Sequence, residues 1–480
     1  MGRATVATSR GLSALTGNVG ALGLDRMGER DSAQRIELDV SILPFGAAAG
    51  STYLDADDLN FVFDSKNRED FDDADRERLA GLVEEGRLSA DAALDLVALR
   101  VRFPGSMALG FRYGHRVQAQ MTFPENFRNN VLASGGIYDQ PDIYRNPEIG
   151  GGWTRHATLA LSGSWNRPYV LPEGERQVWF PSAGFGFSLS YLDGIAHFEI
   201  DSKSYARTRI ISRAGETPRR VEVEGAYTFR SASTLDSSFS PADAILTPSF
   251  IGGNQSAGNG WEGAVGVSVV VLRTRGGTVA TDGANPLIPM PSSRREGVER
   301  DAVTFGLQIE GVGSMKWEGR NYRRVNADIH DTISESDGPI SNDIIYRYEV
   351  PLDTIGAFTT ERGTTLRMGV GCDITAFAPE IPGDLVAGLE AAFDLNDVVG
   401  EGEGSTRLSL GAEWHLPGGF YVRSGLQLGG RVGAAMALGG GFHPFEILQI
   451  DIASGEVLSL LTGDGRRLDL ALRGVLHWEF

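Results

Sequence analysis

The segment Arg466–Phe480 alternates between apolar and polar side chains up to the last residue of the chain. One phase holds Leu468, Leu470, Leu472, Leu476, Trp478 and Phe480, with Gly474 in the remaining position, and the other holds Arg467, Asp469, Ala471, Arg473, Val475, His477 and Glu479. A period of two predicts a β-strand whose two faces meet different surroundings. Soluble domains rarely end on such a strand, because chain ends usually fray. A closed outer-membrane barrel pairs its last strand with its first, so neither edge stays exposed.

The aromatic end of this strand also resembles the C-terminal signal by which bacterial outer-membrane proteins are passed to their insertion machinery. Leu476, Trp478 and Phe480 would form that signal and would face lipid. The insertion machinery and membrane lipid are therefore expected partners. The phase that carries Arg473 and His477 would face the lumen.

The same alternation returns along most of the chain, in the ranges 36–42, 107–113, 117–123, 157–165, 185–191, 303–309, 366–374 and 408–416. A soluble β-sandwich alternates too, but its polar face meets water and commonly carries Lys and Thr. Here the polar phase holds mainly Gly, Ser, Gln and mixed charges, and Lys is scarce. We predict an all-β fold, a transmembrane antiparallel β-barrel of roughly 14 strands with an N-terminal helical insert or plug.

Composition excludes two other classes of protein. No stretch approaches the roughly 18 consecutive apolar residues that a membrane-spanning helix needs. The formal net charge of −19 argues against nucleic acid as a partner, because phosphate binding needs a basic surface. The acidic charge fits acidic loops, and a proteome adapted to salt would give the same number.

The chain begins without the apolar core of a signal peptide. An exported barrel needs such a peptide, so we expect one to have been removed, and a cytosolic chain is the competing interpretation. On the first interpretation the protein resides in the bacterial outer membrane. Residues 1–34 would form a lumenal or periplasmic N-terminal segment, and 35–480 the barrel.

Residues 66–100 break the alternation and predict a helical hairpin inserted into the barrel. Asp70, Asp72, Asp73 and Asp75 crowd the expected start of the first helix, where carboxylates suit the positive end of the helix dipole. Ser89 is the expected N-cap of the second helix. Such a pair is too polar for lipid, so we expect it in the lumen as a plug or on a rim. Its aspartates do not follow the order of a calcium-binding EF-hand loop.

Charged residues on the polar phases are the candidate lumen-lining groups: Arg112, Arg116, Glu310, Arg367, Asp373, Glu390, Arg407, Glu413, Arg423, Arg473 and His477. In a narrow barrel these groups would pair across strands and brace the interior. In a wider barrel they would line a pore and select solutes by charge.

No catalytic, metal-binding or cofactor-binding motif is present. The seven histidines form no HExxH pair, and no G-x-S-x-G elbow or phosphate-binding loop occurs. His156, His415 and His477 lie on polar phases, where hydrogen-bond networks are their expected role. The single cysteine, Cys372, lies on an apolar phase and reads as a small hydrophobic residue. We predict a protein that is not an enzyme and binds no cofactor.

Several segments resemble a known family. Ser9–Leu12 through Gly23-Leu24 resembles the start of mature barrels of the long-chain fatty-acid transporter type. Phe71–Val97 followed by Met107–Gly114 resembles an uncharacterised family of outer-membrane barrels distantly related to those transporters, as do Gly311–Trp317 and Gly429-Gly430-Arg431. The resemblance implies a fold and no activity.

Two functions follow as hypotheses. The first is transport or binding of a hydrophobic or small amphipathic solute, as the alternation, the insert and the resemblance suggest. The second is a non-transporting barrel that anchors other envelope proteins, with the long loops 232–260 and 276–300 as docking surfaces.

Overall fold

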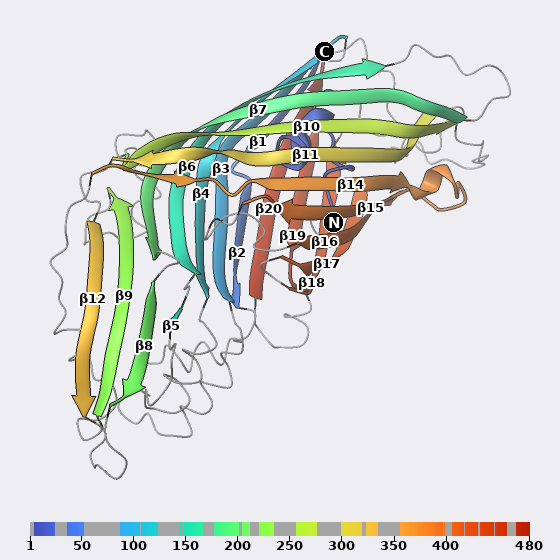
Figure 1. The fold of residues 1–480 in the computed structure, drawn as a ribbon. Coiled ribbons are helices and arrows are strands. Elements are labelled where there is room, and N and C mark those ends of the chain that lie inside the picture. Colours follow the sequence, from blue (N-terminus) through green and yellow to red (C-terminus); the bar gives the residue numbers. More distant parts are fainter. Residues whose placement is uncertain are drawn as a thin grey trace.

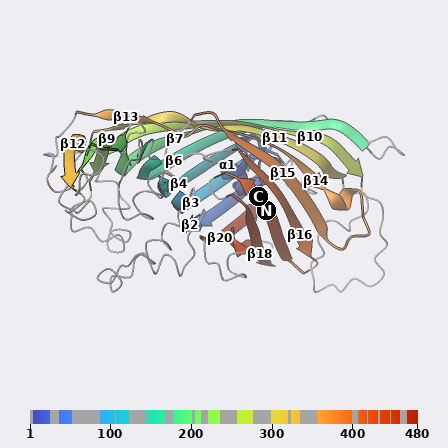
Figure 2. The same cartoon turned by 60° about the horizontal axis from the view of Figure 1, so that its bottom comes forward.

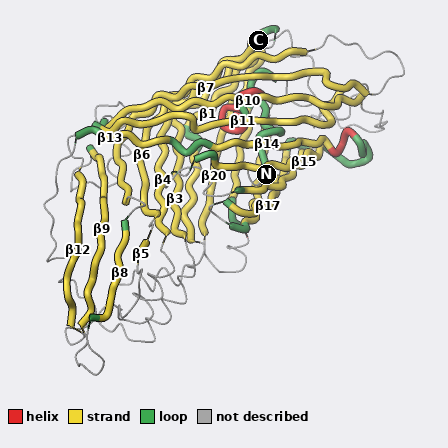
Figure 3. The backbone as a smooth tube through the Cα atoms, in the orientation of Figure 1, coloured by secondary structure: helices red, strands yellow, loops and turns green. Residues whose placement is uncertain are grey.

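The residues that the structure describes are mostly in β-strands, with short helical turns near the N-terminus (Figure 3). The computed structural model describes residues 4–24, 36–51, 87–105, 107–122, 144–145, 148–166, 177–200, 204–211, 220–234, 256–275, 299–318, 323–334, 356–396, 398, 406–416, 418–430, 433–445, 447–457 and 467–480. Its described helices include none that is long and apolar enough to cross a membrane.

The strands of the wall follow one another in chain order, each antiparallel to the next (Figure 1). They are β1 (Glu37–Ile42) with β2 (Phe45–Ser51), β3 (Arg87–Phe103), β4 (Met107–Thr122), β6 (Glu148–Asn166), β7 (Gln177–Ile200), β10 (Gly258–Arg275), β11 (Glu299–Trp317), β13 (Phe358–Glu361) with β14 (Thr365–Asp373), β15 (Asp384–Asp394), β16 (Arg407–Leu416), β17 (Phe420–Gly429), β18 (Ala435–Phe445), β19 (Leu448–Ser454) and β20 (Arg467–Glu479). Because β1/β2 and β13/β14 each make one interrupted strand, the described wall has 14 strands.

The wall closes where its last strand meets its first. β20 pairs with both β1 and β2, and the ladder extends to the final residue. Ile36 N donates to Phe480 O at 3.2 Å, and Phe480 N donates to Ile36 O at 2.9 Å. Since both edges of the sheet are paired, the predicted closed antiparallel barrel is confirmed, and its strand number matches the prediction.

The two ends of the barrel differ. We call the end that holds Ile36 and Phe480 the terminal end; the short connections 104–106, 417–419 and 446–447 lie there. In the tight turn between β16 and β17, Gly418 and Gly419 have φ of 98° and 81°, which L side chains rarely adopt. Most of the longer connections, such as 52–86 and 123–147, leave from the opposite, loop end, whereas the connection 276–298 between β10 and β11 leaves from the terminal end.

A small sheet extends the wall beyond the loop end (Figure 1, lower left). It contains β5 (Tyr144–Arg145), β8 (Tyr205–Ile210), β9 (Arg220–Ser233) and β12 (Arg323–Ser334). At Gly194 strand β7 changes neighbour from β10 to β9, which pairs with Ala196–Ile200. β9 then pairs with β12 and β8.

The prediction of a second helix in the 66–100 insert is wrong. Residues 87–103 form β3, which pairs over its length with β4 and with β1 and β2. Leu and Ala suit a helix by intrinsic propensity, but pairing with neighbouring strands overrides that preference. A bulge between Asp95 and Val97 also shifts the register, so the period of two is broken. The expected first helix lies outside the described residues, as do 235–255 and 276–298 in the long loops.

The wall buries polar and small side chains on its inner face and exposes apolar side chains on its outer face, which is the reverse of a soluble protein. Along β14, Arg367, Gly369 and Gly371 are buried, whereas Val370 between them is exposed. Large apolar side chains point outward from nearly every wall strand, among them Leu159, Leu189, Val265, Leu389, Leu410, Leu426, Ile452 and Leu472. A barrel with a polar interior and an apolar exterior band shows this pattern.

Aromatic side chains border the apolar band at both ends. Near the loop end, Tyr191 and Trp261 meet edge to face with ring centroids 5.2 Å apart. Near the terminal end, Trp165 and Trp179 are exposed on the outer face. Such girdles mark the two interfaces of a membrane, so the outer face between them is the expected contact with lipid.

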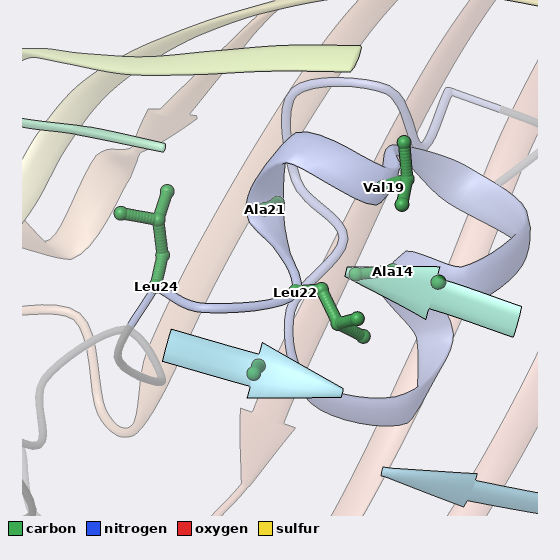
Figure 4. Packing of buried hydrophobic residues seen from close by; sticks show 7 residues of the cluster. Ala14, Val19, Ala21, Leu22 and Leu24 are labelled. Atoms are coloured by element: carbon green, nitrogen blue, oxygen red, sulfur yellow. The ribbon is translucent and has the colours of Figure 1, made fainter. Parts of the chain in front are cut away.

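An N-terminal segment, residues 4–24, lies inside the ring (Figure 2). We call it the inner segment. It contains η1 (Gly11–Ser13), α1 (Ala14–Gly17) and η2 (Val19–Ala21). Figure 4 shows its apolar side chains packing together, and the cluster is completed by Ala108 of β4 and Ala160 of β6. Residues 4–24 of the segment predicted to be lumenal or periplasmic thus lie in the lumen.

Candidate functional site in the lumen

Glycines of the wall let the backbone of the inner segment approach closely. A Cβ atom at Gly369 would lie 2.7 Å from Val6 Cγ1, and one at Gly371 would lie 2.9 Å from Thr8 Cγ2. Other inner-face glycines are covered by the segment in the same way: Gly110, Gly184, Gly186, Gly266, Gly306 and Gly388. These glycines lie on β4, β7, β10, β11, β14 and β15, so together they form a surface shaped to receive the segment.

Replacing Gly266 with valine tests this surface. A Cβ atom there would lie 2.9 Å from Gly20 N, and overpacking of a well-filled interior typically costs about 1–3 kcal/mol. We expect Gly266→Val to detach the inner segment and expose it to protease. Gly474→Val is the matched control, since a Cβ atom there meets nothing within 4 Å. Equal protection of the segment in both variants would contradict the proposed contact.

Glu390 of β15 anchors the start of the inner segment. Its Oε2 accepts hydrogen bonds from Thr5 N at 2.8 Å and Val6 N at 2.7 Å. Its Oε1 accepts from Arg367 Nε at 2.9 Å and from an Arg407 guanidinium nitrogen at 2.8 Å. Arg367 also donates to Thr5 Oγ1 at 2.8 Å. Three of the residues predicted to line the lumen thus form one buried cluster that holds the segment.

Hydrogen bonds also attach the middle of the segment to β10 and β11. Asn18 Nδ2 donates to Val267 O at 2.9 Å, and Val19 N donates to Gln308 Oε1 at 2.8 Å. Thr304 Oγ1 donates to Ala7 O at 2.8 Å. The segment is therefore fixed by specific polar contacts as well as by packing.

A second buried cluster lies where the barrel closes. One nitrogen of Arg100 donates to Glu37 Oε2 and Asp39 Oδ2, both at 2.9 Å, and Arg100 Nε donates to Leu22 O of the inner segment at 2.9 Å. Arg102 bonds Glu37 at 2.6 Å. His477, a predicted lumen residue, lies 2.6 Å from Asp39 Oδ1. β1, β3 and β20 are thus joined by side chains as well as by the ladder.

Sequence reasoning missed the arginines of this cluster. Glu37 and Asp39 lie on the polar phase of the first predicted strand, but Arg100 is the last residue of the predicted helical insert and Arg102 follows it closely. Had residues 87–103 been interpreted as a strand, Arg100 and Arg102 would have shared an inner phase. Alternation over Val97–Phe103 is the signal that could have identified them.

Toward the loop end, ion pairs involve the predicted residues Arg112, Arg116 and Glu310. Arg112 Nε donates to His156 Nε2 at 2.9 Å and lies 3.4 Å from Asp95. Arg116 lies 3.6 Å from Asp91. Glu310 lies 3.6 Å from Arg367. Arg112, Arg116 and Glu310 are partly exposed on the inner face, on the loop-end side of the inner segment.

A further set of charges lies on β16–β20 near the terminal end. We call it the β16–β20 cluster, and it comprises Glu413, His415, Tyr421, Arg423, Gln449, Asp451 and Arg473. Arg423 bonds Glu413 and donates to Asp451 Oδ1 at 2.9 Å. Arg473 Nε donates to Asp451 Oδ2 at 3.1 Å. The Arg423 guanidinium also lies 4.5 Å from the centre of the Tyr421 ring, an arrangement typical of cation–π contact.

Asp373 has a local structural role. It accepts from Arg300 of β11 at 2.9 Å and caps η8 (Ile374–Ala376) through Ala376 N at 3.2 Å. The same arginine bonds Asp384 of β15 at 2.5 Å. These contacts fix the turn between β14 and β15 at the terminal end.

An apolar cluster closes part of the inner face near the loop end. Leu192, Met315 and Trp317 are buried there, and Phe358 packs against them. Trp317 Nε1 donates to Thr360 Oγ1 at 2.9 Å. The lumen thus combines an apolar region near the loop end with charged regions elsewhere. Among the described residues, no group of three His, Cys, Asp or Glu side chains is arranged to bind a metal ion.

The three residues of the predicted insertion signal lie in the closing strand. Leu476 pairs with Val40, and Trp478 pairs with Leu38. Phe480 is exposed on the outer face. The strand therefore presents its apolar phase outward and Arg473 and His477 inward.

Comparison with known proteins finds structural relatives only. No protein-family model matches this chain, and no curated protein matches it either. The Pseudomonas putida toluene transporter TodX is 11% identical, with 100% of this chain and 97% of that chain covered and a TM-score of 0.36. The Ralstonia pickettii toluene transporter TbuX is 9% identical, with coverage of 99% and 96% and a TM-score of 0.37. A Pseudomonas aeruginosa FadL homologue is 10% identical, with coverage of 98% and 94% and a TM-score of 0.36.

The closed barrel of this chain is established by its own strand pairing.

Proposed function

We propose that this protein is an outer-membrane β-barrel that transports a hydrophobic or small amphipathic solute through a lumen narrowed by the inner segment. The observation that carries the proposal is the inverted wall: a closed ring with an exposed apolar exterior and a buried polar interior. In bacterial barrels of this kind the short turns face the periplasm and the longer loops face outward. The terminal end would then be periplasmic.

The solute class follows from what lines the lumen. The apolar cluster around Trp317 lies near the loop end, and ion pairs line the inner face elsewhere. The inner segment occupies part of the ring, so an unrestricted porin is not expected. The charged groups are partly exposed to the lumen, whereas Trp317 is 2% exposed. A solute with a polar group and an apolar body would meet the charged groups directly and would reach the apolar cluster by displacing its side chains.

Uptake by sealed lipid vesicles containing the purified protein tests this function. We expect faster entry of a small aromatic acid such as benzoate than of a neutral trisaccharide, because the inner segment restricts size and the lumen contains apolar side chains. Trp317→Ala should change the rate for benzoate, while the exposed outer-face variant Trp165→Ala should not. Trisaccharide entry at the benzoate rate, or no entry of either solute above empty vesicles, would refute the proposal.

The closing strand is proposed to be the site at which the insertion machinery recognises the chain. Its outward residues Leu476, Trp478 and Phe480 support this role. Phe480→Ala should lower the fraction of protein inserted in cells while leaving refolding of the purified chain into detergent unchanged. A loss of both would assign the residue to stability alone.

The alternative function is a non-transporting barrel that anchors other envelope proteins. The sheet of β8, β9 and β12 favours it, because this sheet extends beyond the wall (Figure 1). Crosslinking in intact envelopes should then recover one constant protein partner. Recovery of none would remove this alternative.

A further inference from the structure

The inner face is covered unequally. Side chains beneath the inner segment are sealed: Arg100 is 0% exposed and Glu390 is 1% exposed. In the β16–β20 cluster, Arg423 is 21% exposed and Arg473 is 29% exposed, although both point inward. Solvent therefore reaches the inner face on the β16–β20 side, as it does at Arg112 and Arg116 toward the loop end.

The contacts of the inner segment explain this difference. Its hydrogen bonds described above reach β3, β10, β11, β14 and β15, and its glycine contacts extend to β4 and β7. On β20 it packs through Leu12 against Val475. The inward residues of β18–β20 are mostly small, including Ala437, Gly439, Ala453 and Ala471. Small side chains leave the guanidinium groups of Arg423 and Arg473 uncovered.

The charges on this side are arranged around one carboxylate. Asp451 accepts hydrogen bonds from four side chains, those of Tyr421, Arg423, Gln449 and Arg473. Its carboxylate therefore holds these side chains in place. Asp451 itself is only 9% exposed, whereas the two arginines present part of their surface to the lumen. Glu413 is 18% exposed beside Arg423, so Arg473, at 29%, is the most exposed of the four charges that a passing solute would meet here.

We propose that the solute passes beside the inner segment, along β16–β20, while the segment stays in place, and that Arg423 and Arg473 determine which solutes pass. This inference rests on the proposed transport function. A route beside a fixed segment requires no detachment of the many contacts that hold it. The exposed guanidinium groups would favour solutes that carry an anionic group.

A disulfide can lock the segment to the wall. A Cβ atom at Gly388 would lie 3.7 Å from Ala4 Cβ, close to the mean separation of about 3.8 Å in disulfides. We would combine Ala4→Cys and Gly388→Cys with Cys372→Ser. Thr8→Ser would be added, since it removes a methyl group 3.0 Å from the new Cβ.

The matched control joins two strands of the wall instead. A Cβ atom at Gly46 would lie 4.0 Å from Ala471 Cβ, so Gly46→Cys with Ala471→Cys forms a bond that leaves the segment free. Faster gel migration of unheated than of heated samples would confirm that each variant is a closed barrel.

Ion conductance in planar lipid bilayers is the measurement. We expect the oxidised segment lock to conduct as the reduced protein and the control do. Ala453→Trp should lower conductance several-fold, and Arg473→Gln in the locked protein should lower the ratio of anion to cation permeability. Conductance that is lost on oxidation of the segment lock alone and restored by reduction would overturn the route, while transport would stand. An unchanged permeability ratio would overturn the role of Arg473. If no variant conducted ions and none took up solute in vesicles, both the route and the transport function would be refuted.

Discussion

Replacing Glu390 with alanine is expected to lower the free energy of unfolding by about 3–5 kcal/mol, because it leaves two buried arginines without their shared carboxylate. The same change removes the acceptor of Thr5 N and Val6 N. The inner segment should then become accessible to protease at a denaturant concentration that leaves the wild type intact. Both effects come from one side chain, since Glu390 holds the wall and the segment together.

Denaturant unfolding in detergent, followed by tryptophan fluorescence, measures the loss of stability. Glu310→Ala is the matched control, because Glu310 makes an ion pair at 3.6 Å and is 34% exposed. Exposed pairs contribute roughly 0–1 kcal/mol. If the two variants were equally stable and equally resistant to protease, Glu390 would not be the anchor of the segment.

Replacing Arg100 with leucine should be similarly costly, at about 3–5 kcal/mol. The change leaves Glu37 and Asp39 buried without their common cation and removes the hydrogen bond to Leu22 O. Since these residues lie on β1 and β3 beside β20, we expect incomplete closure of the barrel. A larger fraction of unheated protein should migrate with the heated form on a gel.

Two comparisons make this result specific. Arg100→Lys keeps the charge and should lose less stability, although a lysine cannot reproduce the fork of the guanidinium. Arg112→Leu removes an arginine that is 24% exposed, so it should leave closure intact. Full closure in Arg100→Leu would show that the ladder between β1 and β20 is sufficient without the cluster.

Alternation along single strands predicted much of the fold, because a barrel wall separates two environments at every residue. The closing strand shows this best: the phases of Trp478 and Arg473 follow from a period of two and are those of the structure. The predicted lumen charges on β14–β17 likewise lie on the buried phase. What each charge pairs with could not be predicted, since Glu390 and Thr5 are 385 residues apart.

The prediction failed where the period changes. The bulge near Asp95 interrupts alternation in β3, and an Ala- and Leu-rich stretch then has the composition of a helix. Asp91 and Asp95 therefore fall within the predicted insert, although in the structure they pair with Arg116 and Arg112. The inner segment posed a different difficulty. The segment fits against the wall because glycines such as Gly369 have no side chain. This role of a glycine becomes visible only when its neighbours in space are known.

The position of the inner segment constrains the order of assembly. The segment precedes β1 in the chain, and Leu12 packs against Ala98 of β3 and Val475 of β20. Sealing β20 against β1 and enclosing the segment must therefore be coupled, because a wall that closed first would require the segment to be threaded through a finished ring. During refolding, protease protection of residues 4–24 should appear together with the gel shift of the closed barrel. Protection that develops only after the shift would show threading instead.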